Sequence, residues 1–393
     1  MTDSPMVHVT PGLVPPPAAT GPEPTLVGLT LFQAGVRVRD RITVDVHGEP
    51  YPVSPVSAGF VALRAERLAA DQPLAAGALR LGRPVVLVGA AAGAAAALAR
   101  ATGSHWSWTA QPEEVHFLTP PAFVADRAAA IRRRQAPRPE GDLPPQRVTA
   151  VGVGPRLYGT AGAVRAALAR AGAVVGTDWT FDTTLPAAGL RLPAGAGRHV
   201  VPYDTTDYDR TIRGVDTTLT ELQRDGVGEI ALLVEGNPDT LDVLDGVRLA
   251  GRTLDLVPGI PVAVAAAWEV GARLRPHPFG SGLAYLSGLP GRHGQSQTQL
   301  RDELSHHLDG GLSCVLVEMT FSELGTAVEA VRRAPVPKTV VVLADYSSPR
   351  ARMRVAHALS PAELREVIVQ GRGVLSTVLV FDDPGGDLAR ALR

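Results

Sequence analysis

Three turns rich in glycine and proline each follow a short apolar run, and each could hold a ligand through main-chain atoms. They span residues 152–160, 236–241 and 257–261. Glycine lets a ligand or a second backbone approach closely because it has no Cβ. Pro155 and the late position of Gly159 break the GxGxxG spacing of a dinucleotide site. Two interpretations stay open for each turn, a ligand-binding loop and an ordinary strand-to-helix connection.

Other reactive residues give weaker signals. Cys314 is the single cysteine and lies in an apolar run, so we expect a buried thiol, not a nucleophile or a zinc ligand. His306 and His307 are adjacent on a predicted helix, 299–308, and cannot both face one metal ion. We expect no metal site, and no HExxH or P-loop motif is present. His105, Trp106 and Trp108 form either an aromatic recognition surface or core packing.

From Arg147 onward, apolar runs alternate with glycine-containing turns and helical patterns, which predicts a mostly parallel sheet covered by helices. In such sheets the ligand crevice lies at the carboxyl ends of the strands, where the three turns occur. The expected strands are 148–153, 173–176, 230–235, 254–257, 283–287, 314–318, 340–343 and 378–381.

The fold class is therefore α/β, and the length of 393 residues suits two or three domains. Residues 25–131 predict an additional amino-terminal α/β or α+β module, with an alternating stretch at 36–46, a helix near 60–70, a strand at 85–88 and an alanine-rich helix after Gly89. The predicted division is a proline-rich tail at 1–24, the module at 25–131, a linker at 132–146 and two lobes at 147–262 and 263–393.

Composition limits the possible partners. Apolar residues make up 45% and charged residues 20% of the chain, as in globular proteins. The 38 basic and 39 acidic residues give a net charge of -1, which argues against a nucleic-acid backbone as partner. Acidic Asp3 stands where a signal peptide is basic, and the longest apolar run, 85–99, is too short to cross a bilayer. We expect a cytoplasmic protein without membrane contact.

Five short motifs follow one another from about Val148 to the end of the chain. They lie at 152–155, 236–238 and 258–262, in a strand that ends with Met319, and in a closing strand at 340–344 before Asp345. In this order they resemble the tetrapyrrole methylase family, the S-adenosylmethionine-dependent class III methyltransferases that include the corrin and porphyrin methylases. The sequence departs from the family pattern at Arg156, at Asn237 and at Pro261 with Val262, where the family has glycine, aspartate and two serines.

The resemblance implies a two-lobed tetrapyrrole-methylase-like fold with S-adenosyl-L-methionine in the cleft between the lobes. Main-chain groups of the turns would hold most of the cofactor, while Met319 is either an adenine contact or a core residue. The implied cofactor-binding residues are Gly154, Pro155, Gly236, Asn237, Pro238, Asp239, Thr240, Leu241, Pro261, Val262, Met319, Ala344 and Asp345.

A polar segment at 203–213 lies where the family binds its acceptor. Tyr208 and Arg213 could orient or polarise the acceptor, and Asp207 could take a proton. Alternatively, Asp207 caps a helix that begins there. Asp178 and His277 are further candidates near the lobe edges.

The sequence thus predicts a methyltransferase that acts on a tetrapyrrole-like or other biosynthetic acceptor, a small molecule or a peptide. The family resemblance implies a homodimer. Two alternatives stay open: methylation of a peptide backbone or natural-product intermediate recruited by the module, and a non-catalytic sensor that binds the cofactor.

Overall fold

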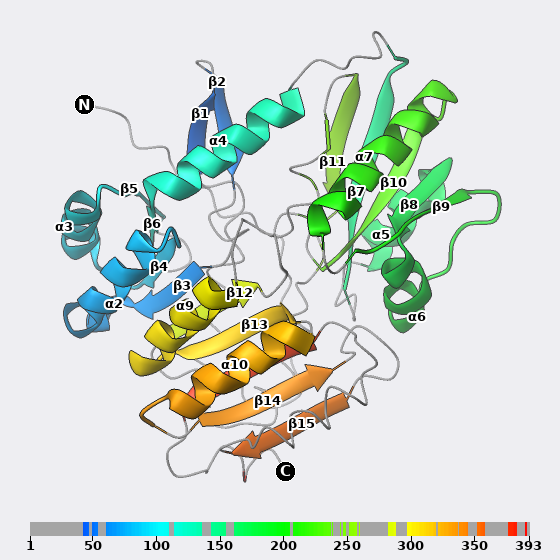
Figure 1. Cartoon of the computed structure of the whole chain (residues 1–393). Coiled ribbons are helices and arrows are strands. Elements are labelled where there is room, and N and C mark those ends of the chain that lie inside the picture. Colours follow the sequence, from blue (N-terminus) through cyan, green and yellow to red (C-terminus); the bar gives the residue numbers. More distant parts are fainter. Residues whose placement is uncertain are drawn as a thin grey trace.

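The computed structural model describes most of the chain between residues 42 and 382, with gaps (Figure 1). The described residues are 42–46, 49–53, 60–109, 114–135, 143–154, 161–204, 207–236, 238, 244, 247–248, 251–257, 259, 282–287, 297–319, 321–336, 338–344, 352–357, 376–382 and 390. They form a five-stranded sheet, a nine-stranded sheet and a two-stranded hairpin of β1 (Ile42–Val46) and β2 (Glu49–Val53). The predicted α/β fold class is confirmed.

The five-stranded sheet is entirely parallel, with the order β11-β7-β10-β8-β9. Two apolar cores cover its two faces, and their helices are α7 (Tyr208–Arg224) and α5 (Ala161–Arg170). Burial on both faces explains why the central strands are continuous apolar runs. The strands are β7 (Gln146–Val153), β8 (Ala173–Thr177), β9 (Gly197–Val201), β10 (Glu229–Glu235) and β11 (Arg252–Val257). A π-helical turn, Thr180–Thr184, and the short α6 (Leu185–Ala187) follow β8.

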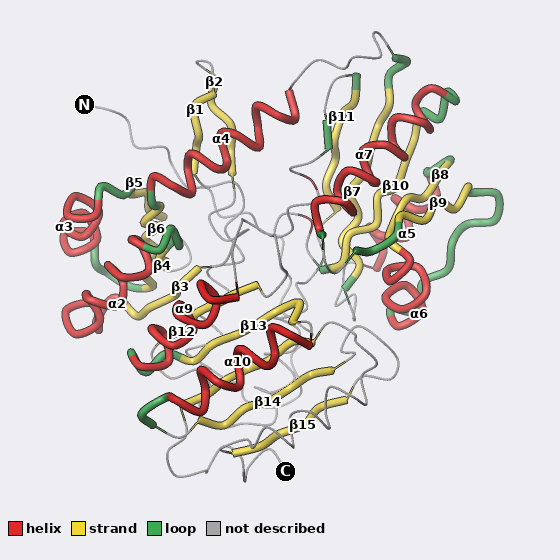
Figure 2. The backbone as a smooth tube through the Cα atoms, viewed as in Figure 1, coloured by secondary structure: helices red, strands yellow, loops and turns green. Residues whose placement is uncertain are grey.

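The nine-stranded sheet has the order β15-β14-β16-β13-β12-β3-β4-β6-β5. Its strands are β3 (Phe60–Arg64), β4 (Val85–Val88), β5 (His105–Thr109), β6 (Val115–Thr119), β12 (Gly282–Ser287), β13 (Ser313–Met319), β14 (Lys338–Ala344), β15 (Arg352–His357) and β16 (Ser376–Asp382). Its helices are α2 (Leu68–Arg80), α3 (Ala92–Thr102), α4 (Pro121–Gln135), α9 (Gln297–Asp309) and α10 (Phe321–Arg333). Figure 2 shows α9 and α10 side by side on one face of this sheet.

Strands from the amino-terminal module and from the carboxyl-terminal region belong to this one sheet. β3 pairs with β12 in antiparallel register, with Leu63 opposite Gly282 and Phe60 opposite Tyr285. One apolar core includes residues of α2, α3, α9 and β13. The predicted division of the chain into a separate module and two lobes did not include this pairing, and the division stays a prediction.

The expected strands are confirmed at all eight positions from 148 to 381, and β4 and α3 are confirmed in the module. The helix predicted near 60–70 is wrong for its first half. Residues 60–64 form β3, which lies between β12 and β4 with four of its five side chains buried. A short apolar run suits a buried strand as well as a helix, and the sheet position decides between them. The strands β9 and β15 were not predicted.

Some predictions lie wholly or partly outside the described residues, among them the tail at 1–24 and the first part of the alternating stretch at 36–46. The predicted linker at 132–146 is described at both ends, where α4 continues to Gln135 and β7 begins at Gln146. No helix among the described residues is long and apolar enough to cross a membrane.

Candidate functional site

Three of the strands that carry the glycine-rich turns are neighbours in the five-stranded sheet. β7 lies between β10 and β11, and all three run in the same direction. Glu235 at the end of β10 is opposite Val153, and Val257 at the end of β11 is opposite Val151. The turns that follow therefore leave from one edge of the sheet, where parallel α/β sheets bind ligands.

The glycines of these turns lie in main-chain contact with one another. A Cβ on Gly152 would meet the nitrogen of Gly259 and would lie 2.5 Å from the carbonyl oxygen of Gly236. A Cβ on Gly259 would meet the same oxygen and would lie 2.8 Å from the carbonyl carbon of Gly152. The amide of Gly236 donates a hydrogen bond of 3.0 Å to Val153, and Gly236 has a φ of 73°. Gly152 and Gly259 therefore have no room for a Cβ, and Gly236 has a backbone conformation that favours glycine.

The structure places the described cofactor candidates in two groups. Gly154, Gly236 and Pro238 are buried at or beside the turns of the five-stranded sheet. Met319 and Ala344 end β13 and β14 of the nine-stranded sheet, and both are register partners of Ser376 in β16. The remaining candidates lie outside the described residues: Pro155, Asn237, Asp239, Thr240, Leu241, Pro261, Val262 and Asp345.

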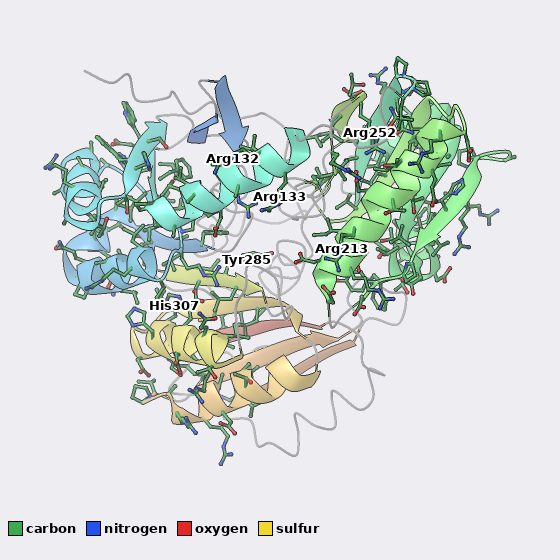
Figure 3. All side chains as sticks on the ribbon, turned by 45° about the horizontal axis from the view of Figure 1, so that its top comes forward. Arg132, Arg133, Arg213, Arg252, Tyr285 and His307 are labelled. Atoms are coloured by element: carbon green, nitrogen blue, oxygen red, sulfur yellow. The ribbon has the colours of Figure 1, made fainter. Side chains whose placement is uncertain are left out.

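The polar segment before α7 is fixed by carboxylates that accept main-chain hydrogen bonds. Asp207 is the N-cap of α7, and its Oδ1 accepts from the amide of Arg210 at 3.2 Å. Its Oδ2 accepts from Nη2 of Arg213 at 3.2 Å, and Figure 3 shows Arg213 near the start of α7. The amide of Asp207 in turn donates to Oδ1 of Asp204 at 3.0 Å. The capping interpretation of Asp207 is confirmed, and the side chain of Tyr208 is outside the described part.

The carboxylate of Asp178 also binds main-chain amides. Its Oδ1 accepts hydrogen bonds from the amides of Trp179 at 2.9 Å and Tyr203 at 3.0 Å. These contacts tie the end of β8 to the segment that follows β9. His277, the other edge candidate, lies outside the described residues.

A buried polar network at the opposite edge of the sheet was not predicted. Arg252, at the start of β11, donates to Asp216 Oδ1 at 2.9 Å, to Thr220 Oγ1 at 3.0 Å and to Gln146 Oε1 at 2.8 Å. These contacts join β11 to β7 and α7. They help to set the register of two strands that end at the glycine turns. Nothing local in the sequence indicates this network, because its members are far apart along the chain.

Cys314 is fully buried, and burial raises the pKa of its thiol, so the predicted core thiol is confirmed. His307 is also fully buried, while Trp106 packs against the core and donates to His116 Nδ1 at 3.3 Å. Within the described ranges, no group of three histidine, cysteine or carboxylate side chains could hold a metal ion.

No family model and no curated protein matches the sequence. Solved structures of methyltransferases are similar to part of the chain. The methyltransferase CobJ is 19% identical over 60% of this chain and 94% of its own, with a TM-score of 0.43. The cobalamin biosynthetic enzyme cobalt precorrin-4 methyltransferase, CbiF, is 15% identical over 63% of this chain and 96% of its own, with a TM-score of 0.42. Uroporphyrin-III C-methyltransferase from Thermus thermophilus, complexed with S-adenosyl homocysteine, is 19% identical over 62% of this chain and 99% of its own, with a TM-score of 0.42. Their substrates and ligands are properties of those proteins.

Proposed function

We propose that this protein is an S-adenosylmethionine-dependent methyltransferase of the tetrapyrrole methylase type. Its acceptor is a tetrapyrrole-like or other biosynthetic compound, and it works as a cytoplasmic homodimer. The observation that carries the proposal is the main-chain contact of the turns at Gly152, Gly236 and Gly259. These glycines belong to three of the five motifs that resemble the family.

The described residues fit such a cofactor in their chemistry. A parallel sheet edge offers main-chain donors and acceptors, which suit an adenine edge and an amino-acid head group. Gly154, Gly236 and Pro238 are buried at that edge. When bound, S-adenosylmethionine supplies a methyl group on a sulfonium. The protein's own task is to align the acceptor and to exclude water.

On the acceptor side we propose Tyr208, Arg213 and Asp207. Arg213 is exposed at the start of α7 and can present guanidinium donors to a carbonyl or carboxylate. Asp207 already caps the helix and contacts Arg213, so it fixes the direction of that guanidinium. If a proton must leave the acceptor, the Asp207 carboxylate accepts it.

Titration calorimetry of the full chain with S-adenosylmethionine and with S-adenosylhomocysteine tests the proposal. We expect both to bind, and Gly236→Ala to weaken both. Gly189→Ala is the matched control, because Gly189 has a φ of 65° against 73° for Gly236, and a Cβ there would meet nothing within 4 Å. Absence of binding to the wild-type protein would refute the cofactor and the methyltransferase together.

A second measurement separates an enzyme from a sensor. The protein is incubated with S-adenosylmethionine and candidate tetrapyrrole or peptide acceptors, and chromatography measures the S-adenosylhomocysteine that is released. Release that depends on an acceptor supports the enzyme. Tight cofactor binding with no release for any acceptor supports the sensor.

A further inference from the structure

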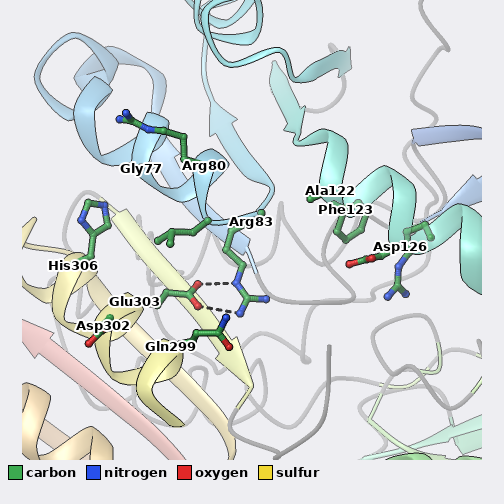
Figure 4. A pocket seen from close by; sticks show the side chains of 13 residues that line it. Gly77, Arg80, Arg83, Ala122, Phe123, Asp126, Gln299, Asp302, Glu303 and His306 are labelled. Carbon is green, nitrogen blue, oxygen red and sulfur yellow. Dashed lines mark hydrogen bonds and ion pairs between the residues drawn. The ribbon is translucent and has the colours of Figure 1, made fainter. Parts of the chain in front are cut away.

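A pocket of about 630 Å³ lies where the amino-terminal part of the nine-stranded sheet meets α9 (Figure 4). The end of α2, the first half of α4 and one side of α9 form its walls. Its volume is within the range of small-molecule sites, which is about 300–1,000 Å³. None of the residues proposed for methyl transfer lines it.

A buried ion pair forms one fixed wall of this pocket. Arg83 Nε lies 2.7 Å from Oε1 of Glu303, and Nη2 lies 3.0 Å from Oε2. The side chain of Arg83 is 10% exposed and that of Glu303 is 4% exposed. Burial would raise the pKa of Glu303, but its interactions with His307 and Arg83 bring it to about 2. The carboxylate is therefore ionised at neutral pH and holds the guanidinium in place.

Apolar groups stand beside these charges. Phe123 is buried, and the guanidinium carbon of Arg127 lies over its ring, 5.5 Å from the centroid. Leu81 lines the pocket and is 53% exposed, so its side chain offers apolar surface to a ligand. His306 also lines the pocket, and burial lowers its pKa, so the imidazole is neutral at pH 7.

One charged group of the lining has no partner within the part of the chain that the structure describes. The carboxylate of Asp126 makes no hydrogen bond or ion pair there, although Asp126 lies one residue from Arg127. Figure 4 shows Asp126 directed into the space between α4 and Arg83. The pocket thus combines the exposed carboxylate of Asp126, an apolar surface and three lining guanidinium groups, those of Arg80, Arg83 and Arg127.

We propose that this pocket binds a zwitterionic ligand, an amino acid or a short peptide with an apolar side chain. The ligand's ammonium group pairs with Asp126, and its carboxylate lies at the guanidinium groups of Arg83 and Arg127. Its apolar side chain packs between Leu81 and Phe123. The inference does not depend on the proposed methyl transfer.

Calorimetry with defined probes tests this site in the full chain. The probes are free leucine and phenylalanine, the dipeptide Leu-Leu, and the same dipeptide with an acetylated amine or an amidated carboxyl group. Saturable binding of the free amino acids supports an amino-acid site, and binding of the uncapped dipeptide alone supports a peptide site. For a peptide site the capped dipeptides bind at least about tenfold more weakly than the uncapped dipeptide, because a charge-assisted hydrogen bond is lost. Failure of every probe to bind overturns the proposal.

Three variants locate the binding. Asp126→Asn should weaken the best probe about 10- to 100-fold. Asp225→Asn, at the exposed end of α7, is the matched control and should leave binding unchanged. Ala122→Trp fills the pocket from its exposed rim and should abolish binding while circular dichroism and the melting temperature stay those of the wild type. Equal binding by the wild type, Asp126→Asn and a folded Ala122→Trp would place the ligand elsewhere and overturn the proposal.

Discussion

Replacing Gly152 by alanine tests whether main-chain contact of the turns builds the candidate site. The added Cβ would lie 2.5 Å from the Gly236 oxygen and 2.6 Å from the Gly259 Cα, and it would also meet the Gly259 nitrogen. All three are backbone atoms, so two turns must move apart to make room. Overpacking of this kind costs about 1–3 kcal/mol, and we expect the free energy of unfolding in urea to fall by that amount. S-adenosylmethionine binding should weaken as well.

The control is Gly162→Ala in α5. A Cβ at Gly162 would meet nothing within 4 Å, and alanine favours a helix over glycine by about 0.5–1 kcal/mol. This variant should therefore be slightly more stable than the wild type and should bind the cofactor equally well. A Gly152→Ala protein with wild-type stability and wild-type cofactor affinity would show that the turns need not touch.

Three further predictions concern buried charges and the start of α7. The pKa of Glu303 is about 2 in the folded chain and 4.5 in the unfolded chain, so the ionised carboxylate contributes its full stabilisation of the fold above pH 4.5. Roughly 3 kcal/mol of stability should be lost as the pH falls from 4.5 to 2, and urea unfolding of Glu303→Gln should lack this loss. Arg252→Met should lower the free energy of unfolding in urea by about 1–3 kcal/mol, because its hydrogen bonds to Gln146 and Thr220 are lost while Asp216 keeps its ion pair with Arg248 at 2.7 Å. Asp207→Ala should lose about 1 kcal/mol of helix capping, as measured by thermal unfolding, whereas Asp207→Asn keeps the cap. Lower turnover in a stable Asp207→Asn protein would support proton acceptance, and unchanged turnover would contradict it.

Much of the parallel sheet could be predicted because its strands are buried on both faces. Such strands are continuous apolar runs, as in β7 and β10. β9 could not be found in this way, because it is an edge strand with the sequence Gly-Arg-His-Val-Val and only its last residue is buried. The error at 60–64 has another cause. The apolar run there has no clear period, and pairing with β12, more than 200 residues later, makes it a strand.

The site was predicted in its local features but not in its long-range contacts. The glycines at 152, 236 and 259 could be identified because each interrupts the apolar pattern, Gly152 near the end of β7 and the other two just after β10 and β11. That they touch one another follows only from the order of the strands, in which β7 separates β10 from β11. The alternative roles of Asp207 illustrate the same point. Its sequence position permits a cap or a base, and the hydrogen bond to the amide of Arg210 establishes the cap.

The continuous nine-stranded sheet limits what the amino-terminal module can do. β3 and β12 are hydrogen-bonded in its interior, the rings of Phe60 and Tyr285 stack at 5.6 Å, and Arg83 neutralises the buried Glu303 of α9. Without the module, β12 would expose its edge and Glu303 would be a buried charge without its guanidinium. A module joined in this way cannot recruit an acceptor by swinging on a flexible tether. Any acceptor that contacts it is held at a fixed position relative to β13 and β14, whose ends carry Met319 and Ala344.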